Sequence, residues 1–172
     1  ATVESEELTL TVQSNALYII ANGHYFYTVG RVMNLNGHMY VPIRPLARAF
    51  ARELNWNGDL RRVELTSVDG KRAVAPANYN ADDLYWLSRI IYAESGAESE
   101  KGQIAVGNVV LNRVSSAEFP NTIPEVIFDR VDGIQFEPVE NGSIYKVPSA
   151  LSVSVAKQVL DGADTIGEAM YF

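Results

Sequence analysis

The hydrophobic pattern of this 172-residue chain changes its period between residues 74 and 81. In the first part apolar residues alternate with polar ones, as in Leu8–Val12, which is typical of strands with one buried face. Beyond residue 81 they recur every three or four positions, as in Leu84, Leu87 and Ile91, which predicts helices. Val74–Asn80 follows neither period and contains the proline and asparagine of a linker. We therefore predict two domains, residues 1–76 and 81–172.

The first domain is expected to be small and strand-rich with one helix. The turn sequence Asn-Gly, which favours two-residue hairpins, occurs at Asn22-Gly23 and Asn36-Gly37. From Pro45 to Leu54 the spacing is helical. The expected strands are Leu8–Val12, Ala16–Ile20, Val32–Leu35, Met39–Val41 and Arg62–Thr66. With a mainly helical second domain, the predicted fold class is α+β.

Part of the first domain resembles a known module. Tyr40–Ala47, followed by Leu54–Asn57 and a strand, is similar to the stalk-type module named after the copper amine oxidase N-terminal domain, over roughly residues 20–68. Such modules recur in secreted bacterial envelope proteins, and the name implies no copper chemistry. The resemblance implies a secreted or cell-envelope location. His24 and His38 lie near the Asn-Gly turns, and we expect them to be solvated and to bind no metal.

Composition limits the partners and the chemistry. A formal net charge of −7 argues against nucleic acid and anionic membranes, because both require a basic surface. No apolar run approaches the ~20 residues of a membrane-spanning helix. Cysteine is absent and both histidines lie in the first half, so chemistry in the second domain depends on carboxylates, hydroxyls, amides and aromatic groups. We expect no cofactor.

Glu94 occupies an unusual position in the first predicted helix of the second domain. This helix is expected to begin with Asp82 or Asp83 as its cap and to end near Ser95. Its apolar stripe, extended by three residues, reaches Glu94. Burial and the negative end of the helix dipole would both favour the protonated form, which is the form that a glycosidic general acid needs. From the spacing alone, a solvated Glu94 at the end of the helix is the simpler interpretation.

Further helices are expected after Glu94. Residues 99–114, with Ser99 as cap, are apolar nearly all round and predict a buried central helix, in which Gly107 indicates close packing of another backbone. Asn108 and Asn112 lie one turn apart and could tie down loops or line a sugar-binding groove, and we favour the first role.

The remainder of the second domain is predicted to contain two helices and a long loop. Thr122 is expected to cap a short helix, and Ser149 is expected to cap a last helix that ends at Leu160. The segment Val131–Pro148 is longer than ordinary connections, and loops of this length are often functional.

The second domain resembles the SleB/CwlJ cell-wall hydrolase family over about residues 82–172. The resemblance rests on several separate motifs in the same order and spacing. These motifs are Leu84–Ser95, Gly102–Gly107, Val109–Val114, Phe119–Ile123, Gln135-Phe136, Gly142–Tyr145 and Ala169–Phe172. Members of the family usually continue past the final Tyr-Phe, whereas this sequence ends at Phe172.

The resemblance implies a lysozyme-like helical domain that cuts the glycan strands of peptidoglycan, in many members those of the spore cortex. It implies that Glu94, which follows Tyr-Ala, is the catalytic acid. It makes Gln135, Phe136, Tyr145 and Tyr171 candidate substrate-binding residues, because they fall on the motifs of the family.

The predicted reaction is that of a lytic transglycosylase, in which one glutamate suffices because a muramic acid hydroxyl attacks within the substrate. A hydrolase with two carboxylates is the alternative, and Glu137 is the best candidate for the second one. A protein that binds the cell wall without cleaving it is a further alternative.

Overall fold

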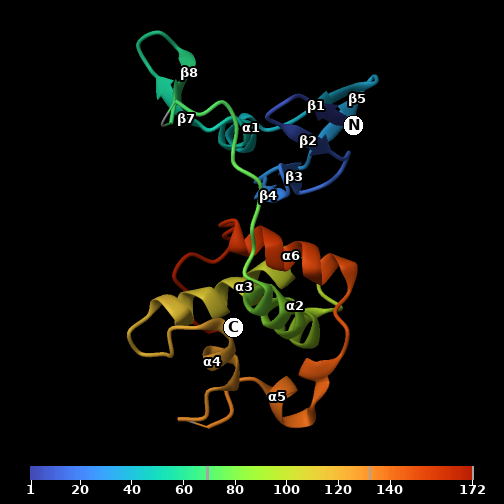
Figure 1. Ribbon diagram of the computed structural model, residues 1–172, viewed down its shortest axis with the longest axis vertical. Helices are drawn as coiled ribbons and strands as arrows, with labels where there is room; N and C mark the ends of the chain where they lie inside the picture. Colours follow the sequence, from blue (N-terminus) through green and yellow to red (C-terminus); the bar gives the residue numbers. More distant parts are fainter. Residues whose placement is uncertain (69, 132, 172) are drawn as a thin grey trace. The chain divides into compact units, whose positions relative to one another are not determined.

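The structure is a computed structural model that describes residues 1–68, 70–131 and 133–171. The chain forms two compact units, Ala1–Ala77 and Asn78–Phe172 (Figure 1). Strands and helices are both present, which confirms the predicted α+β class. Each unit is described by itself below.

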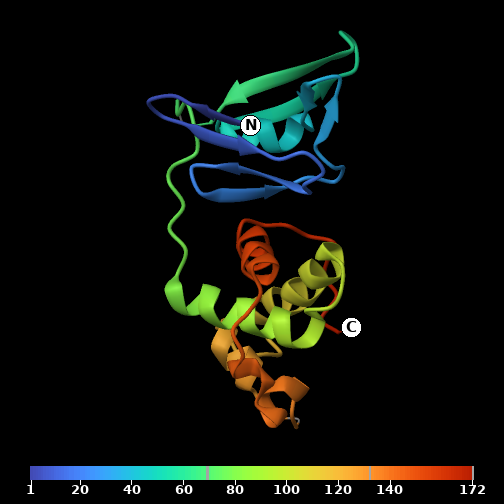
Figure 2. The ribbon, with the colours of Figure 1, turned by 90° about the vertical axis from the view of Figure 1, so that its right-hand side faces the viewer.

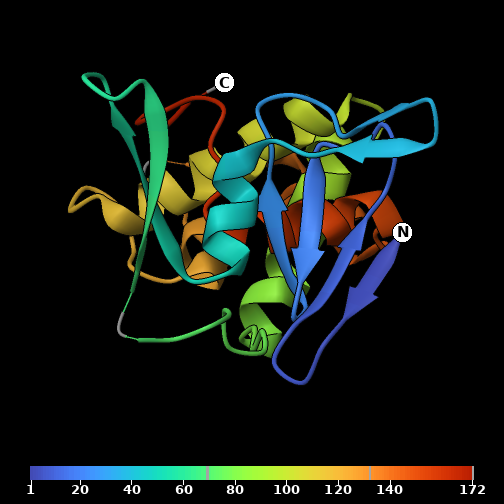
Figure 3. The same ribbon diagram turned by 90° about the horizontal axis from the view of Figure 1, so that it is seen from above.

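The first unit is built on a four-stranded antiparallel sheet. Its strands, in sheet order, are β1 (Thr2–Glu4), β2 (Thr9–Val12), β3 (Tyr18–Ala21) and β4 (His24–Tyr27). The helix α1 (Ile43–Ala49) packs against β3 and β4 (Figure 3). The hairpin predicted at Asn22-Gly23 is confirmed, because both residues have positive φ angles of 50° and 87°. The core beneath the sheet consists of Leu8, Val12, Ile19, Ala21, Phe26, Val32 and Ala49.

Two further hairpins complete this unit. Strands β5 (Met33–Leu35) and β6 (His38–Tyr40) form the second predicted hairpin, with φ angles of 52° and 83° at Asn36-Gly37. Strands β7 (Arg52–Asn57) and β8 (Arg62–Ser67) form the third. The helix expected from Pro45 to Leu54 is therefore wrong in its second half. It ends at Ala49 because Ala51 adopts a left-handed φ of 48° and the following residues pair with β8.

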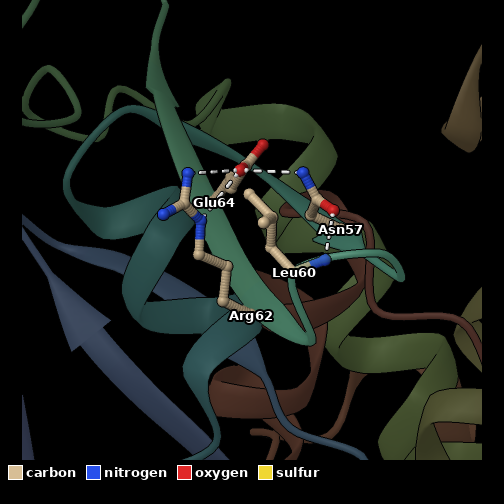
Figure 4. A network of polar contacts seen from close by, with 4 residues as sticks. All are labelled: Asn57, Leu60, Arg62 and Glu64. Atoms are coloured by element: carbon tan, nitrogen blue, oxygen red, sulfur yellow. Dashed lines mark hydrogen bonds and ion pairs between the residues drawn. The ribbon is translucent and has the colours of Figure 1, made fainter.

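The β7–β8 hairpin carries a polar network at its turn (Figure 4). Asn57 donates from Nδ2 to Oε1 of Glu64 at 3.1 Å, and Arg62 donates from Nε to the same oxygen at 3.0 Å. The Asn57 side-chain oxygen accepts from the backbone N–H of Leu60 at 3.0 Å. The asparagine side chain therefore holds the turn and one face of the hairpin together.

The second unit is helical. The long helices are α2 (Ala81–Ser95), α3 (Glu100–Ser115) and α6 (Ala150–Leu160), and each packs against the other two (Figure 2). Shorter helices are α4 (Ile123–Phe128), which packs on α2 and α3, α5 (Glu137–Asn141) and the 3₁₀ turn η1 (Ser143–Tyr145). As predicted, α3 is largely buried. In the described part of the chain, no helix has the length and apolar character needed to cross a membrane.

Helix caps were predicted well at three of the four starts. The hydroxyls of Ser99, Thr122 and Ser149 each accept a backbone N–H in the first turn of α3, α4 and α6. The prediction was wrong for α2, where the cap is Asn80 and its side chain accepts from the N–H groups of Asp82 and Asp83. The two aspartates instead lie in the first turn, where the helix dipole favours negative charge.

Gly107 lies where α3 meets its two long neighbours. A Cβ atom there would approach Val159 Cγ2 of α6 to 2.9 Å and Ile91 Cδ1 of α2 to 3.0 Å. The close packing predicted at this glycine is confirmed, but the neighbours are side chains and not a backbone. Only a residue without a side chain fits between these two helices.

The side chains of Asn108 and Asn112 bind the segment that follows α6. Asn108 donates to the carbonyl of Ala163 at 2.6 Å and accepts from the N–H of Thr165 at 3.1 Å. Asn112 donates to the carbonyls of Gly167 at 2.7 Å and Ala169 at 2.8 Å. The role that we favoured for these amides, which was to tie down a loop, is confirmed.

Candidate active site

Glu94 lies in the last turn of α2 and is half-buried. It lines a pocket of about 420 Å³ between the end of α2 and the segment that follows α5. The other lining residues are Tyr92, Ala93, Gly96, Ala97, Ser143 and Lys146. Glu94 is therefore partly buried in a pocket beside the segment 131–148, and is not a solvated residue on an open helix end.

The surroundings of Glu94 favour its protonated form. Burial raises the pKa of the Glu94 carboxyl, and the negative charge of Glu137 raises it further. Glu137 is the first residue of α5 and is exposed. A carboxyl group that remains protonated to higher pH can donate a proton to a leaving oxygen.

The segment Val131–Pro148 is more ordered than the predicted loop. It contains α5 and η1, and both contact α2. Asp132, which falls in the predicted loop, lies outside the described residues. The glycine-rich and proline-rich sequence hid two short helices, because Pro138 is acceptable in a first helical turn and Gly142, at φ 77°, ends α5. Ser143 of η1 and Lys146 after it line the pocket opposite the residues at the end of α2.

Tyr145 is placed beside the acid site. It is 62% exposed, follows the pocket residue Ser143 by two positions, and its ring centre lies 6.2 Å from that of Trp86. Trp86 also packs edge-on against Phe128 at 4.8 Å and Tyr85 at 4.9 Å. The sequence-based selection of site residues missed Trp86, although it lies in the same motif as Glu94 and two turns before it.

Gln135 and Tyr171 lie together, but in a different pocket. They line a hollow of about 490 Å³ that shares no lining residue with the pocket of Glu94. Its other lining residues are Ala117, Glu118, Phe119, Pro120, Asp129 and Val131. Phe136 requires a correction, because only 2% of it is exposed and its ring is part of the core, where a substrate cannot reach it.

Arg113 is a buried cation behind this second pocket. It is 5% exposed, and its guanidinium carbon lies 5.0 Å from the ring centre of Phe119 and 5.1 Å from those of Phe136 and Tyr171. Desolvation lowers the pKa of Arg113, while Tyr171 and Asp129 act in the opposite direction. The sequence-based selection also missed Arg113. The available signal was a charged residue on a helix that is otherwise apolar nearly all round.

The two histidines lie in the first unit. His24 belongs to β4 and His38 to β6, which are strands of different sheets. Across residues 1–68, 70–131 and 133–171, no group of three or more His, Cys, Asp or Glu side chains is arranged to hold a metal ion.

A glutamate with a raised pKa in a pocket of a small helical unit defines a candidate general-acid site for cutting a glycosidic bond. Comparison with known families agrees with this class. Residues 97–172 match the family described as Cell Wall Hydrolase.

Curated relatives and a solved structure are similar over the same part of the chain. The spore cortex-lytic enzyme of Bacillus cereus is 37% identical over 97 residues, which are 56% of this chain and 36% of that protein. That of Halalkalibacterium halodurans is 33% identical over 102 residues, which are 59% of this chain and 30% of that protein. The catalytic domain of the germination-specific lytic transglycosylase SleB from Bacillus anthracis is 37% identical, with a TM-score of 0.50, over 56% of this chain and 77% of that structure.

The chain thus spans about a third of the length of the curated relatives that it matches. Its helical unit is similar to the SleB/CwlJ type of cell wall hydrolase catalytic domain.

Proposed function

We propose that the helical unit cleaves the glycan strands of peptidoglycan as a lytic transglycosylase, with Glu94 as its single acid and base. The observation that carries the proposal is the half-buried Glu94 in its pocket, with a pKa raised first by burial and then by Glu137. The names of the relatives point in the same direction, because they are a spore cortex-lytic enzyme and a germination-specific lytic transglycosylase. The spore cortex is therefore the proposed substrate, and germination the proposed setting.

The proposed reaction uses Glu94 twice. The protonated carboxyl gives its proton to the glycosidic oxygen as the bond from that oxygen to the muramic acid residue breaks. The carboxylate that results then takes the proton of a hydroxyl on the same muramic acid as this hydroxyl attacks the sugar carbon. The product carries an anhydro-muramic end, and Glu94 is again protonated. Tyr145, which lies between the pocket residues Ser143 and Lys146 in the sequence, and Trp86, whose ring packs against it, are the proposed platform for the glycan strand.

A hydrolase with two carboxylates is the second candidate, and the position of Glu137 favours it. The charge of Glu137 raises the pKa of Glu94, so a second carboxylate is near enough to interact with it. In such a hydrolase Glu137 would activate a water molecule or attack the sugar, and the products would have reducing ends.

Mass spectrometry of fragments released from purified cortex peptidoglycan separates the two reactions. The transglycosylase predicts anhydro-muramic ends, and it predicts that Glu137→Gln retains most of the cleavage. Reducing muramic ends together with loss of cleavage in Glu137→Gln would establish the two-carboxylate hydrolase instead. Glu98→Gln, at an exposed glutamate near Glu94 in sequence, is the matched control and should behave as wild type.

For the first unit we propose a stalk-like role outside the cytoplasm. The support is the similarity of residues 20–68 to the modules of secreted envelope proteins. A chain with this unit would act on the cell wall or the cortex, and its only proposed partner is the glycan strand. Binding of two whole-chain variants to insoluble peptidoglycan tests which unit adheres. One variant substitutes Trp86 of the helical unit, and the other substitutes Trp56 of the first unit. Loss of binding in the Trp56 variant alone would assign adhesion to the first unit.

A further inference from the structure

The guanidinium of Arg113 connects segments that are far apart in the sequence. Its Nε donates to the carbonyl oxygen of Met170 at 2.9 Å, and its Nη1 donates to Oε1 of Gln135 at 3.4 Å. The guanidinium also lies over the ring of Phe136 at 5.1 Å. Arg113 itself is held in the last turn of α3, the central buried helix of the unit. It therefore connects the pair Gln135-Phe136 to the central buried helix of the unit.

This pair determines where α5 begins. Phe136 is the N-cap residue of α5, and Glu137 is its first residue. The helix has only five residues, and no side-chain hydrogen bond caps its start. A helix this short has little stability of its own, so its position depends on the tertiary contacts of its ends. The contact of Arg113 with Phe136 is such a contact, one residue before Glu137.

Glu137 in turn is near enough to the candidate acid to interact electrostatically with it. Helix α5 contacts α2, which carries Glu94 in its last turn. The other titratable groups around Glu94 are Tyr92 of α2 and Lys146 after η1, which line the same pocket. Among the described residues that line it, none comes from α3, α4 or α6.

We propose that Arg113 is a positioning residue, which holds the start of α5 and thereby sets the place of Glu137 relative to Glu94. The inference rests on the proposed role of Glu94 as the acid. Arg113 does not touch the pocket of Glu94, and its effect passes through Phe136 and α5.

The test is a pH titration of Glu94 in the full chain. NMR of ¹³C-labelled glutamate carboxyl groups monitors the titration, and Glu94→Gln assigns the signal. Arg113→Lys keeps the positive charge but removes the planar group that donates to two acceptors and lies over the rings. The expected result is a shift of the Glu94 midpoint to lower pH by a fraction of a pH unit, because Glu137 is no longer held near Glu94. In a Glu137→Gln background the same substitution should produce no further shift.

Two further variants test the interpretation. Phe136→Leu removes the other side of the contact and should also lower the midpoint, which keeps the proposal testable if Arg113→Lys fails to fold. Asn112→Ala, on the same helix, releases the carbonyls of Gly167 and Ala169 without touching Gln135 or Phe136. It should lower stability and leave the midpoint unchanged.

An unchanged midpoint in folded Arg113→Lys would overturn the proposal. So would an equal shift with and without Glu137, or an equal shift in Asn112→Ala. The titration is measured without substrate, so its outcome does not depend on whether the chain is a transglycosylase. If wild type fails to cleave peptidoglycan while Arg113→Lys still shifts the Glu94 midpoint, the proposed function is wrong and the role of Arg113 stands.

Discussion

Burial raises the pKa of the Glu94 carboxyl group at the end of α2, and the negative charge of Glu137 on α5 raises it further. A nearby negative charge disfavours ionisation of a carboxyl group, so residues of both helices affect the protonation of Glu94. Burial, the larger contribution to the raised pKa, comes from the packing of α2. The smaller contribution comes from Glu137, on a short helix whose position depends on its neighbours.

Glu94→Gln should abolish cleavage of cortex peptidoglycan while the protein still binds it. Donation of a proton by a positioned acid contributes about 10²–10⁴-fold to the rate, and an amide cannot replace it. Release of soluble fragments and co-sedimentation with insoluble peptidoglycan measure the two properties separately. If wild type itself binds without releasing fragments, the chain is a wall-binding protein and the role proposed for Glu94 is wrong.

Cleavage should fall as the pH rises through the pKa of Glu94, because the acid must be protonated to act. Glu137→Gln removes the smaller of the two causes that raise this pKa. The alkaline limb of the pH–rate profile should therefore move to lower pH in this variant, while burial keeps the pKa of Glu94 above its ordinary value. Initial rates of turbidity loss across a pH series give the comparison. An alkaline limb that does not move would separate Glu137 from the acid.

Glu94→Gln should also stabilise the fold at neutral and higher pH. The pKa of Glu94 is higher in the folded chain than in the unfolded one, so its favourable contribution is fully present below the unfolded pKa and is lost as the pH rises through the folded pKa. The glutamine variant has no such loss. The difference in melting temperature, variant minus wild type, should grow with pH across this window. A difference that is constant with pH contradicts the raised pKa.

Gly107→Ala should destabilise the helical unit by about 1 kcal/mol, since the strain of overpacking exceeds the gain in helix propensity. The new methyl group would meet Val159 Cγ2 at 2.9 Å and Ile91 Cδ1 at 3.0 Å. Urea denaturation measures the change in the free energy of unfolding. In a Val159→Ala background the penalty should become smaller, and an equal penalty there would show that contact with Val159 is not its source.

Asn108→Ala should cost about 1–3 kcal/mol, because a buried carbonyl and a backbone N–H lose their partner together. These are the carbonyl of Ala163 and the N–H of Thr165. Hydrogen exchange of residues 163–170 should become faster before the rest of the unit is affected. Ser115→Ala, at the exposed end of the same helix, is a control that should leave this exchange unchanged.

Local signals in the sequence predicted local structure. The two Asn-Gly hairpins and the caps Ser99, Thr122 and Ser149 depend on a few neighbouring residues, and all were predicted. The helix that was expected to reach Leu54 failed because helical spacing over ten residues cannot show that residues 52–57 will pair with β8. Tertiary pairing decided the conformation there.

The same limit applies to the site. Glu94 could be singled out because its position on a helical stripe and its resemblance to a family motif agree. The burial of Phe136 could not be predicted, because it depends on Arg113, which lies 23 positions earlier on another helix. The distribution of Gln135 and Tyr171 into a separate pocket depends in the same way on contacts across the whole unit.

The hydrogen bonds from α3 to the segment after α6 also define how much chain the unit needs in order to fold. The bonds from Asn108 and Asn112 span 55 and 57 residues, so they close only when nearly all of the unit has been synthesised. A fragment that stops at Leu160 would keep α2 to α6 and still leave the Asn108 amide without its acceptor at Ala163. Such a fragment loses a hydrogen bond of its central helix. The irregular residues 163–170 are therefore as much a part of the cooperative folding unit as the helices that precede them.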